Sequence, residues 1–237
     1  MFKKIVATGA IALFTLTSTV FGASAAGPVS NPNTPGAGVA AQAAIAAAPK
    51  TVTPEEAEAL QFMREEEKLA HDVYVTLSEQ WDLRVFNNIA RAEQQHTDAV
   101  AYWLEYYDLS DPTVGFEFGE FDNDDLQALY DKLVAQGSQS VADALKVGSA
   151  IEEIDILDLQ ERLEVTDNSA LVRLFENLER GSENHLRAFV QNLDAQTGTK
   201  YVPQYLSQAA YDEIVAETDT PGAGWNAGRG GRRGGRP

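Results

Sequence analysis

Residues 63–74 read MREEEKLAHDVY, and this stretch carries the pattern that decides the fold. Apolar side chains recur at Met63, Ala70 and Tyr74, a spacing of three to four residues that gathers them on one face of an α-helix. Glu67 falls on the same face, so a carboxylate interrupts an otherwise apolar stripe. The stretch therefore predicts an amphipathic helix with an acid in the middle of its buried face.

The same helical period continues along the chain. Thr53, Pro54 and Glu56 mark the start of the first helix, as an N-cap, a first-turn proline and the acid of a capping box. The period predicts long helices over residues 54–80, 85–107, 141–163 and 169–194, and short helices over 124–136 and 208–215. Two long helices, a long crossover and two more long helices are typical of an all-α four-helix bundle with one long connection.

Each long helix carries a charged or imidazole side chain in the middle of its apolar stripe. These residues are Glu67, Glu93, His96, Glu152 and His185. A buried ionised carboxylate must be paired, coordinated or protonated, and divalent metals compensate several carboxylates at once while neutral imidazoles complete their coordination. Since Glu93 and His96 are three residues apart, they form the Glu-x-x-His element of carboxylate-bridged di-metal bundles. The set predicts a metal site inside the bundle.

Other polar residues near these positions receive different assignments. Asp155 lies one turn after Glu152 and is predicted to be a further ligand or a residue that orients an imidazole. The remaining neighbours are expected outside the ligand set: Glu65 and Glu66 in solvent or at the helix seam, and Glu153 on a polar face with Lys146 and Gln160. His71 is expected either to support the ligands from behind or to be a surface partner of Glu67.

The composition restricts the chemistry available to such a site. The chain has no cysteine, which excludes disulfides, thiolate zinc sites and iron–sulfur clusters, so any metal must be held by oxygen and imidazole. The formal net charge is −18, and all acidic residues fall between Glu55 and Asp219. Such an acidic body repels nucleic acid and attracts cations, so no specific nucleic-acid recognition is expected.

The two ends of the chain differ in composition from its body. Lys3 and Lys4 precede an apolar stretch over residues 5–21, and the small residues 23–25 resemble a cleavage site, which together predict a cleaved signal peptide. The predicted organisation is a signal peptide at 1–25, an Ala/Pro/Gly-rich linker at 26–52, the bundle at 53–217 and a disordered Gly/Arg-rich tail at 218–237. We therefore expect a secreted, periplasmic or cell-surface protein. Its tail either contacts polyanions or is a disordered segment that touches acidic surfaces, including the protein's own body.

Several of these motifs resemble those of known proteins. Residues 67–74 resemble the first-helix Glu-x-x-Ala-x-x-x-Tyr pattern of rubrerythrin-like proteins, and residues 93–96 match their second-helix ligand pair. The chain thus resembles the ferritin-like superfamily. Residues 63–70, 151–156 and 181–189 more closely resemble a bacterial and archaeal ferritin-like family known only as a domain of unknown function. This resemblance implies the same bundle and the same five ligands.

One position departs from the ferritin-like pattern. The fourth helix of di-iron sites usually carries a second Glu-x-x-His, and here Ser182 stands where that glutamate belongs. Either Asp155 or Glu179 substitutes for it, or the site holds a single metal or a labile second one.

Together with the predicted signal peptide, the resemblance leads to the hypothesis of an exported di-iron protein with ferroxidase, peroxide-consuming or iron-sequestering activity, with Mn or Zn as other metals that such a site accepts. Dioxygen or peroxide would be its partner, and Tyr74 would act catalytically by hydrogen bonding or electron relay. The alternative role for Tyr74 is core packing with a satisfied hydroxyl. A homo-oligomer is also compatible with this interpretation. The alternative is a non-catalytic cell-surface or binding module with a structural metal or none.

Overall fold

A computed structural model describes residues 49–217 of the chain. The predicted signal peptide, nearly all of the linker and the Gly/Arg-rich tail lie outside these residues. Within the described part there are six α-helices and no strand: α2 (Pro54–Trp81), α3 (Arg84–Tyr106), α4 (Asp124–Gly137), α5 (Val141–Glu164), α6 (Ser169–Thr197) and α7 (Gln208–Ala216). The all-α prediction is confirmed, and the helix ends differ from the predicted ones by three residues at most. Over the same residues, no helix has the length and apolarity needed to cross a bilayer.

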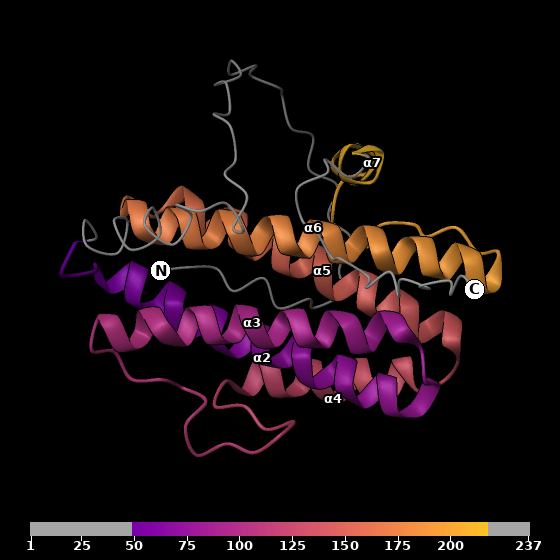
Figure 1. The fold of residues 1–237 in the computed structure, drawn as a ribbon, viewed down its shortest axis with the longest axis horizontal. Helices are drawn as coiled ribbons and strands as arrows, with labels where there is room; N and C mark the ends of the chain where they lie inside the picture. The colour runs from indigo at the N-terminus through magenta and orange to yellow at the C-terminus, as the bar shows by residue number, and fades with distance from the viewer. Residues whose placement is uncertain (1–48, 218–237) are drawn as a thin grey trace, which may run out of the picture.

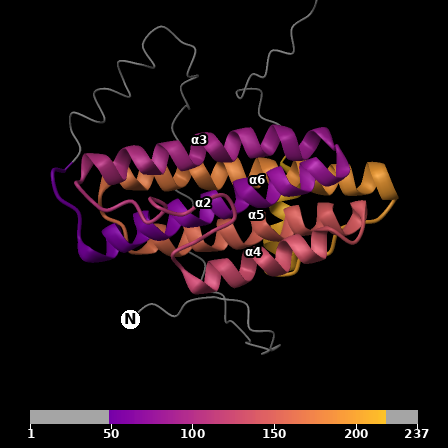
Figure 2. The ribbon, with the colours of Figure 1, turned by 90° about the horizontal axis from the view of Figure 1, so that it is seen from below.

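The four long helices lie side by side as a bundle (Figures 1 and 2). Helices α2 and α3 pack along each other, as do α5 and α6, and the two pairs meet through contacts of α2 with α5 and of α3 with α6. The crossover between α3 and α5 contains α4, which contacts both α2 and α5. The capping box predicted at the start of α2 is present, since Thr53 Oγ1 accepts the Glu56 N–H and Glu56 accepts the Thr53 N–H.

The core of the described residues consists of two apolar clusters with polar residues between them. The first cluster includes Val73, Tyr74, Phe86, Leu145, Phe189 and Leu193, and the second includes Leu60, Met63, Val100, Leu159, Leu171 and Phe175. Along each long helix the chain passes from one cluster to the other through polar residues that are buried or, at His96, partly buried. We call these the polar layer: Glu67, Glu93, His96, Glu152, Asp155, Ser182 and His185.

A second face of α2 holds the crossover in place. Arg64 Nε donates to Asp111 Oδ2 at 3.0 Å, and Lys68 Nζ donates to two crossover carbonyl oxygens. Glu65 Oε1 accepts the backbone N–H of Asn123 at 3.0 Å. Glu65 is therefore buried at the seam, which is one of its two predicted places, and does not face solvent.

The segment after α6 folds back onto α5. One carboxylate of α5, Glu153, accepts backbone N–H groups of Gln204, Tyr205 and Leu206 at 3.0, 2.7 and 2.7 Å. Glu153 is fully buried, so the expected polar surface face with Lys146 and Gln160 is wrong for this residue. The cause is the returning chain, which supplies the donors that a buried carboxylate needs.

Candidate metal centre

The four long helices each contribute to the polar layer at the same level of the bundle. Glu67 comes from α2, Glu93 and His96 from α3, Glu152 from α5 and His185 from α6. The three glutamates are at most 2% exposed, because the two apolar clusters cover them from both ends. All five predicted ligand residues therefore converge inside the bundle; that they bind metal stays a prediction.

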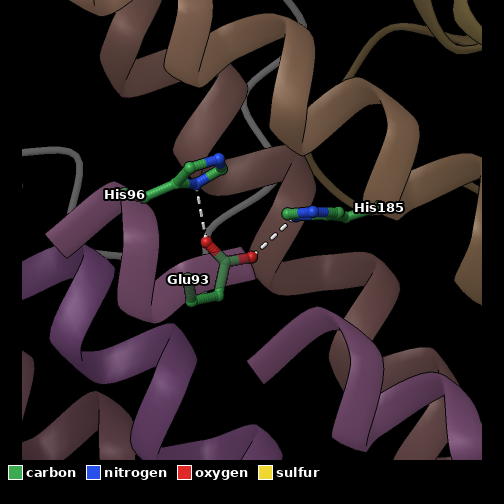
Figure 3. Close-up of side chains that lie close together, drawn as sticks. All are labelled: Glu93, His96 and His185. Atoms are coloured by element: carbon green, nitrogen blue, oxygen red, sulfur yellow. Dashed lines mark ion pairs between the residues drawn. The ribbon is translucent and has the colours of Figure 1, made fainter. Parts of the chain in front are cut away.

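Glu93 lies at the centre of this arrangement, between the two imidazoles (Figure 3). Its Oε2 lies 2.8 Å from Nδ1 of His96, and its Oε1 lies 2.7 Å from Nδ1 of His185. One donor atom from each of these three residues lies within 4.8 Å of the other two. This spacing allows a single glutamate to face two different imidazoles with its two oxygens.

The other two glutamates stand on opposite sides of Glu93. Glu67 Oε2 lies 3.2 Å from Nδ1 of His96, and Glu152 Oε2 lies 3.6 Å from Nδ1 of His185. The imidazole rings themselves stack with their centroids 5.4 Å apart. The centre thus consists of two similar halves, each with one imidazole, one terminal glutamate and one oxygen of Glu93.

Tyr74 fixes the orientation of one terminal glutamate. Its hydroxyl donates to Glu152 Oε1 at 2.5 Å, while the ring packs against Phe86 and Phe189. The hydroxyl of Tyr74 is therefore satisfied by a member of the polar layer. Because the remaining oxygen of Glu152 is the one nearest His185, the hydrogen bond leaves that oxygen available to the centre.

Asp155 and Ser182 form a pair at the same level. Ser182 Oγ donates to Asp155 Oδ2, and Asp155 Oδ1 is buried with no hydrogen-bond partner among the described residues. Glu179, the other substitute considered for the missing glutamate, instead accepts a hydrogen bond from Gln160 at 2.8 Å on the outside of the bundle. The structure thus brings Asp155 to the centre and leaves Glu179 outside it.

Burial and charge together shift the pKa values of these groups. Burial raises the pKa of Glu67 and of Glu152 to about 7. Burial also works against ionisation of Glu93, but His185 and His96 outweigh it, so the pKa of Glu93 lies below its usual value. Burial lowers the pKa of His185, but Glu93 and Glu152 outweigh this effect and raise the pKa to about 10.

Several buried donor atoms of the centre lack the partner that burial requires. Glu67 Oε1, Glu93 Oε1 and His185 Nδ1 make no hydrogen bond within residues 49–217. Four carboxylates face two imidazoles here, so the metal-free centre must take up protons to offset its charge. Carboxylate oxygens and imidazole nitrogens are donors that Fe, Mn and Zn accept, and the residues present therefore fit a divalent metal.

Two residues near the centre do not belong to it in the way the sequence indicated. His71 Nδ1 lies 2.8 Å from Asp72 Oδ1, so its partner is Asp72 and not Glu67. Glu66 is buried rather than solvent-facing, and its carboxyl group contacts that of Asp158. The sequence did contain a signal for Asp158, because it continues the three-residue spacing of Glu152 and Asp155 along α5.

Comparisons with known proteins place these residues within a family. The family described as an uncharacterized protein domain, DUF2202, matches residues 56–218. The chain is 48% identical over 179 residues to the uncharacterized protein MJ0754 of Methanocaldococcus jannaschii, and the match covers 75% of this chain and 96% of that protein. The crystal structure of MJ0754 superposes with a TM-score of 0.69, over 70% of this chain and 95% of that chain.

Proposed function

The chain belongs to the DUF2202 family, and we propose that its bundle is a ferritin-like metal centre that holds two iron ions and oxidises or sequesters iron or consumes peroxide. The observation that carries the proposal is the division of the centre into two halves by Glu93. Each of its oxygens lies within 2.8 Å of one imidazole Nδ1. A carboxylate shared in this way suits two ions better than one.

The wiring of the helices supports the ferritin-like part of the proposal. A pair of long helices, a long crossover and a second pair enclose the centre, with Glu-x-x-His on the second long helix. The fourth long helix supplies His185 without the usual glutamate. Asp155 compensates, since its free Oδ1 comes from the neighbouring helix α5.

The residues of the chain would divide the work of such a centre. Glu67 with His96 would hold one ion, Glu152 with His185 the other, and Glu93 would contact both. Bound ferrous ions would supply the electrons for reduction of dioxygen or peroxide. Tyr74 would keep Glu152 oriented and its hydroxyl proton close to the centre.

The two imidazoles are the part of the proposed centre that solvent reaches. The side chains of His96 and His185 are 17% and 11% exposed, whereas the glutamates beside them are sealed from solvent. The acidic body of the protein would concentrate cations around these imidazoles. Export through the predicted signal peptide would bring the centre to iron outside the cytoplasm.

Elemental analysis of the purified mature chain tests the metal, and addition of Fe(II) with oxygen or peroxide tests the chemistry. Because the proposed centre holds two ions, we expect about two iron ions per chain. We also expect a ferric absorption band to grow rapidly after the addition. Full helicity without any bound metal would remove the proposal.

The second candidate is a binding module with a structural metal at the same residues. The deep burial of the three glutamates favours it, because a permanently held ion needs no access. Stoichiometric metal without ferric formation would select this alternative over the enzyme.

A further inference from the structure

Four aromatic residues gather at the end of α3, beyond the metal centre. We call these the aromatic cluster: Tyr102, Trp103, Tyr106 and Tyr107. The centroid of the Trp103 ring system lies 5.3 Å from that of Tyr102, 5.2 Å from that of Tyr106 and 5.7 Å from that of Tyr107. Aromatic rings at these separations are in contact, so Trp103 touches each of the other three rings.

Trp103 connects the aromatic cluster to the metal centre along α3. It follows His96 by seven residues, which is nearly two full turns, so both side chains fall on the same face of the helix. The helix is continuous over this interval, and seven residues advance about 10.5 Å along it. Trp103 is partly buried against the second apolar cluster, so along α3 it stands between the centre and the outer rings.

Tyr102 brings the aromatic cluster to the surface. It is 43% exposed, whereas Tyr107 is buried and its hydroxyl accepts a hydrogen bond from Asn168 at 2.8 Å. Asp98 and Glu105 are exposed residues four positions before and three positions after Tyr102 on the same helix. Carboxylates one turn to either side of the ring attract cations from solution towards it.

Indole and phenol rings can each give up one electron, and few other side chains of this protein compete with them. The chain has no cysteine, and Met63, the one methionine among the described residues, is fully buried. Rings in contact exchange electrons because their π-systems touch. The aromatic cluster is therefore suited to carry electrons one at a time between the surface and the interior.

Tyr74 lacks such a connection to the surface, although the sequence allows it a role in electron relay. It is fully buried, and within the described residues its ring contacts are with Phe86 and Phe189. Phenyl rings are much harder to oxidise than phenol or indole rings, so an electron lost from Tyr74 would not be replaced through these neighbours. Trp103 instead lies on a helix of the centre and touches an exposed tyrosine.

We propose that the aromatic cluster is an electron relay, through which Fe²⁺ at the surface supplies electrons for the reduction of peroxide at the metal centre. The inference rests on the proposed function and adds a second role for iron, as a donor that stays outside the bundle. Trp103 passes an electron towards the centre, Tyr102 replaces it, and Fe²⁺ then restores Tyr102. The tyrosine gives its phenolic proton to water when oxidised and regains a proton when reduced. Two electrons and two protons convert one peroxide into two waters, so two Fe²⁺ become Fe³⁺ for each O–O bond broken.

The first test needs no metal, because it asks only whether the rings exchange electrons. Azide radicals made by pulse radiolysis oxidise tryptophan in the metal-free mature chain, and the absorption of tryptophan and tyrosine radicals is followed over time. We expect the tryptophan radical to decay as a tyrosine radical appears, at a rate independent of protein concentration. Trp103→Phe should lose this phase. The matched control Trp81→Phe, which replaces a partly buried tryptophan whose indole N–H bonds to the Gly137 carbonyl, should keep it.

The second test mixes iron-loaded protein with peroxide and freezes it rapidly for electron paramagnetic resonance. The unaltered protein and Trp81→Phe should both show an organic radical, and Trp103→Phe should lose most of it with its iron content unchanged. Tyr102→Phe alters an exposed ring and leaves the core intact. It should slow the oxidation of Fe²⁺ added beyond the amount that the centre holds.

Radical formation in Trp103→Phe equal to that of the unaltered protein, in either test, would overturn the relay. Iron-loaded protein that forms no organic radical with peroxide would overturn it as well, while leaving the metal centre in place. A chain that binds no iron would remove the centre and the relay together, and elemental analysis of the same samples separates this result from the others.

Discussion

His185 Nδ1 lies 2.7 Å from Oε1 of Glu93, yet no hydrogen bond joins the two atoms within the described residues. A contact this short without hydrogen-bond alignment means that the ring N–H direction and the carboxylate lone pair do not point along the line between them. An oxygen and a nitrogen that approach each other in this way can both coordinate a metal ion placed beside them. The relationship therefore favours a metal at the centre over a simple ion pair.

Replacement of Glu93 by glutamine tests this relationship. Glu93→Gln keeps the shape of the side chain but removes the charge that both imidazoles face, so we expect bound iron to fall by more than the roughly 10–100-fold typical of residues outside the ligand shell. Elemental analysis after dialysis measures the loss. Glu105→Gln, at an exposed position of the same helix, serves as the control and should retain its iron. Unchanged iron content in Glu93→Gln would show that the centre is assigned to the wrong residues.

The stability of the metal-free protein should depend on pH. Because the pKa values of Glu67 and Glu152 rise to about 7 from 4.5, the folded protein keeps protons that the unfolded chain has released, and stability falls as the pH rises through that window. The pKa of His185 rises to about 10 from 6.5, so its contribution is full below pH 6.5 and is lost as the pH rises towards 10. Glu93, whose pKa is lowered, contributes its full stabilisation above pH 4.5, so it does not reverse the fall in stability at higher pH.

Bound metal should stabilise the protein more strongly as the pH rises, because the ligands must lose their protons to bind it. We expect the Tm of metal-free protein to decrease from pH 5.5 to 8.5, and the increase in Tm on adding metal to grow over the same range. Thermal unfolding followed by circular dichroism, with chelator or with metal, measures both. Glu67→Gln should flatten the metal-free slope, and a stabilisation by metal that is equal at all pH values would contradict the assignment.

The helices and the level of the centre could be predicted because both are recorded in local patterns. The apolar period of each long helix is interrupted at Glu67, Glu93, Glu152 or His185, and the interruptions meet because the helices are of similar length and lie side by side. The capping box at Thr53 located the start of α2 in the same local way.

Residues whose partners come from distant segments could not be assigned correctly. Glu153 looks like a surface acid by period alone, and its burial depends on backbone N–H groups of residues 204–206, which leave no mark in a sequence. The contact of Glu66 with Asp158 likewise depends on how α2 rotates against α5. The sequence offered the departure at Ser182 and two possible substitutes, Asp155 and Glu179, but it could not choose between them; the hydrogen bond from Ser182 to Asp155 does.

Gly181 controls the position of His96 from the facing helix. A Cβ atom at residue 181 would lie 2.5 Å from Cε1 and 2.6 Å from Nε2 of His96, far inside van der Waals contact. We expect Gly181→Ala to displace the ring from Glu93 and to lower bound metal. Alanine itself is favoured over glycine in a helix by about 1 kcal/mol, so helicity should be preserved.

Bound metal and thermal stability are measured together for Gly181→Ala, so that displacement of the His96 ring is distinguished from a general loss of folding. Glu176→Ala, at an exposed position of the same helix, adds helix propensity without touching the centre and should leave the metal unchanged. If Gly181→Ala retains full metal content, the ring of His96 has room to move, and the close packing is not what fixes it.

Glu152 and Glu153 are neighbours on α5 with separate tasks, and substitution can separate them. Glu153→Gln removes the charge from a carboxylate that accepts three backbone N–H groups, and charge-assisted bonds of this kind contribute about 1.5–3 kcal/mol each. We expect the Tm to fall and hydrogen exchange to quicken at residues 201–216. The hydrogen bond from Arg187 to the Ile214 carbonyl would still hold this segment to α6. Bound metal should stay at the unaltered level, because Glu153 faces the returning chain rather than the polar layer. The exposed Glu164→Gln variant gives the baseline for exchange, and a parallel loss of metal in Glu153→Gln would mean that the C-terminal segment and the centre are coupled through α5.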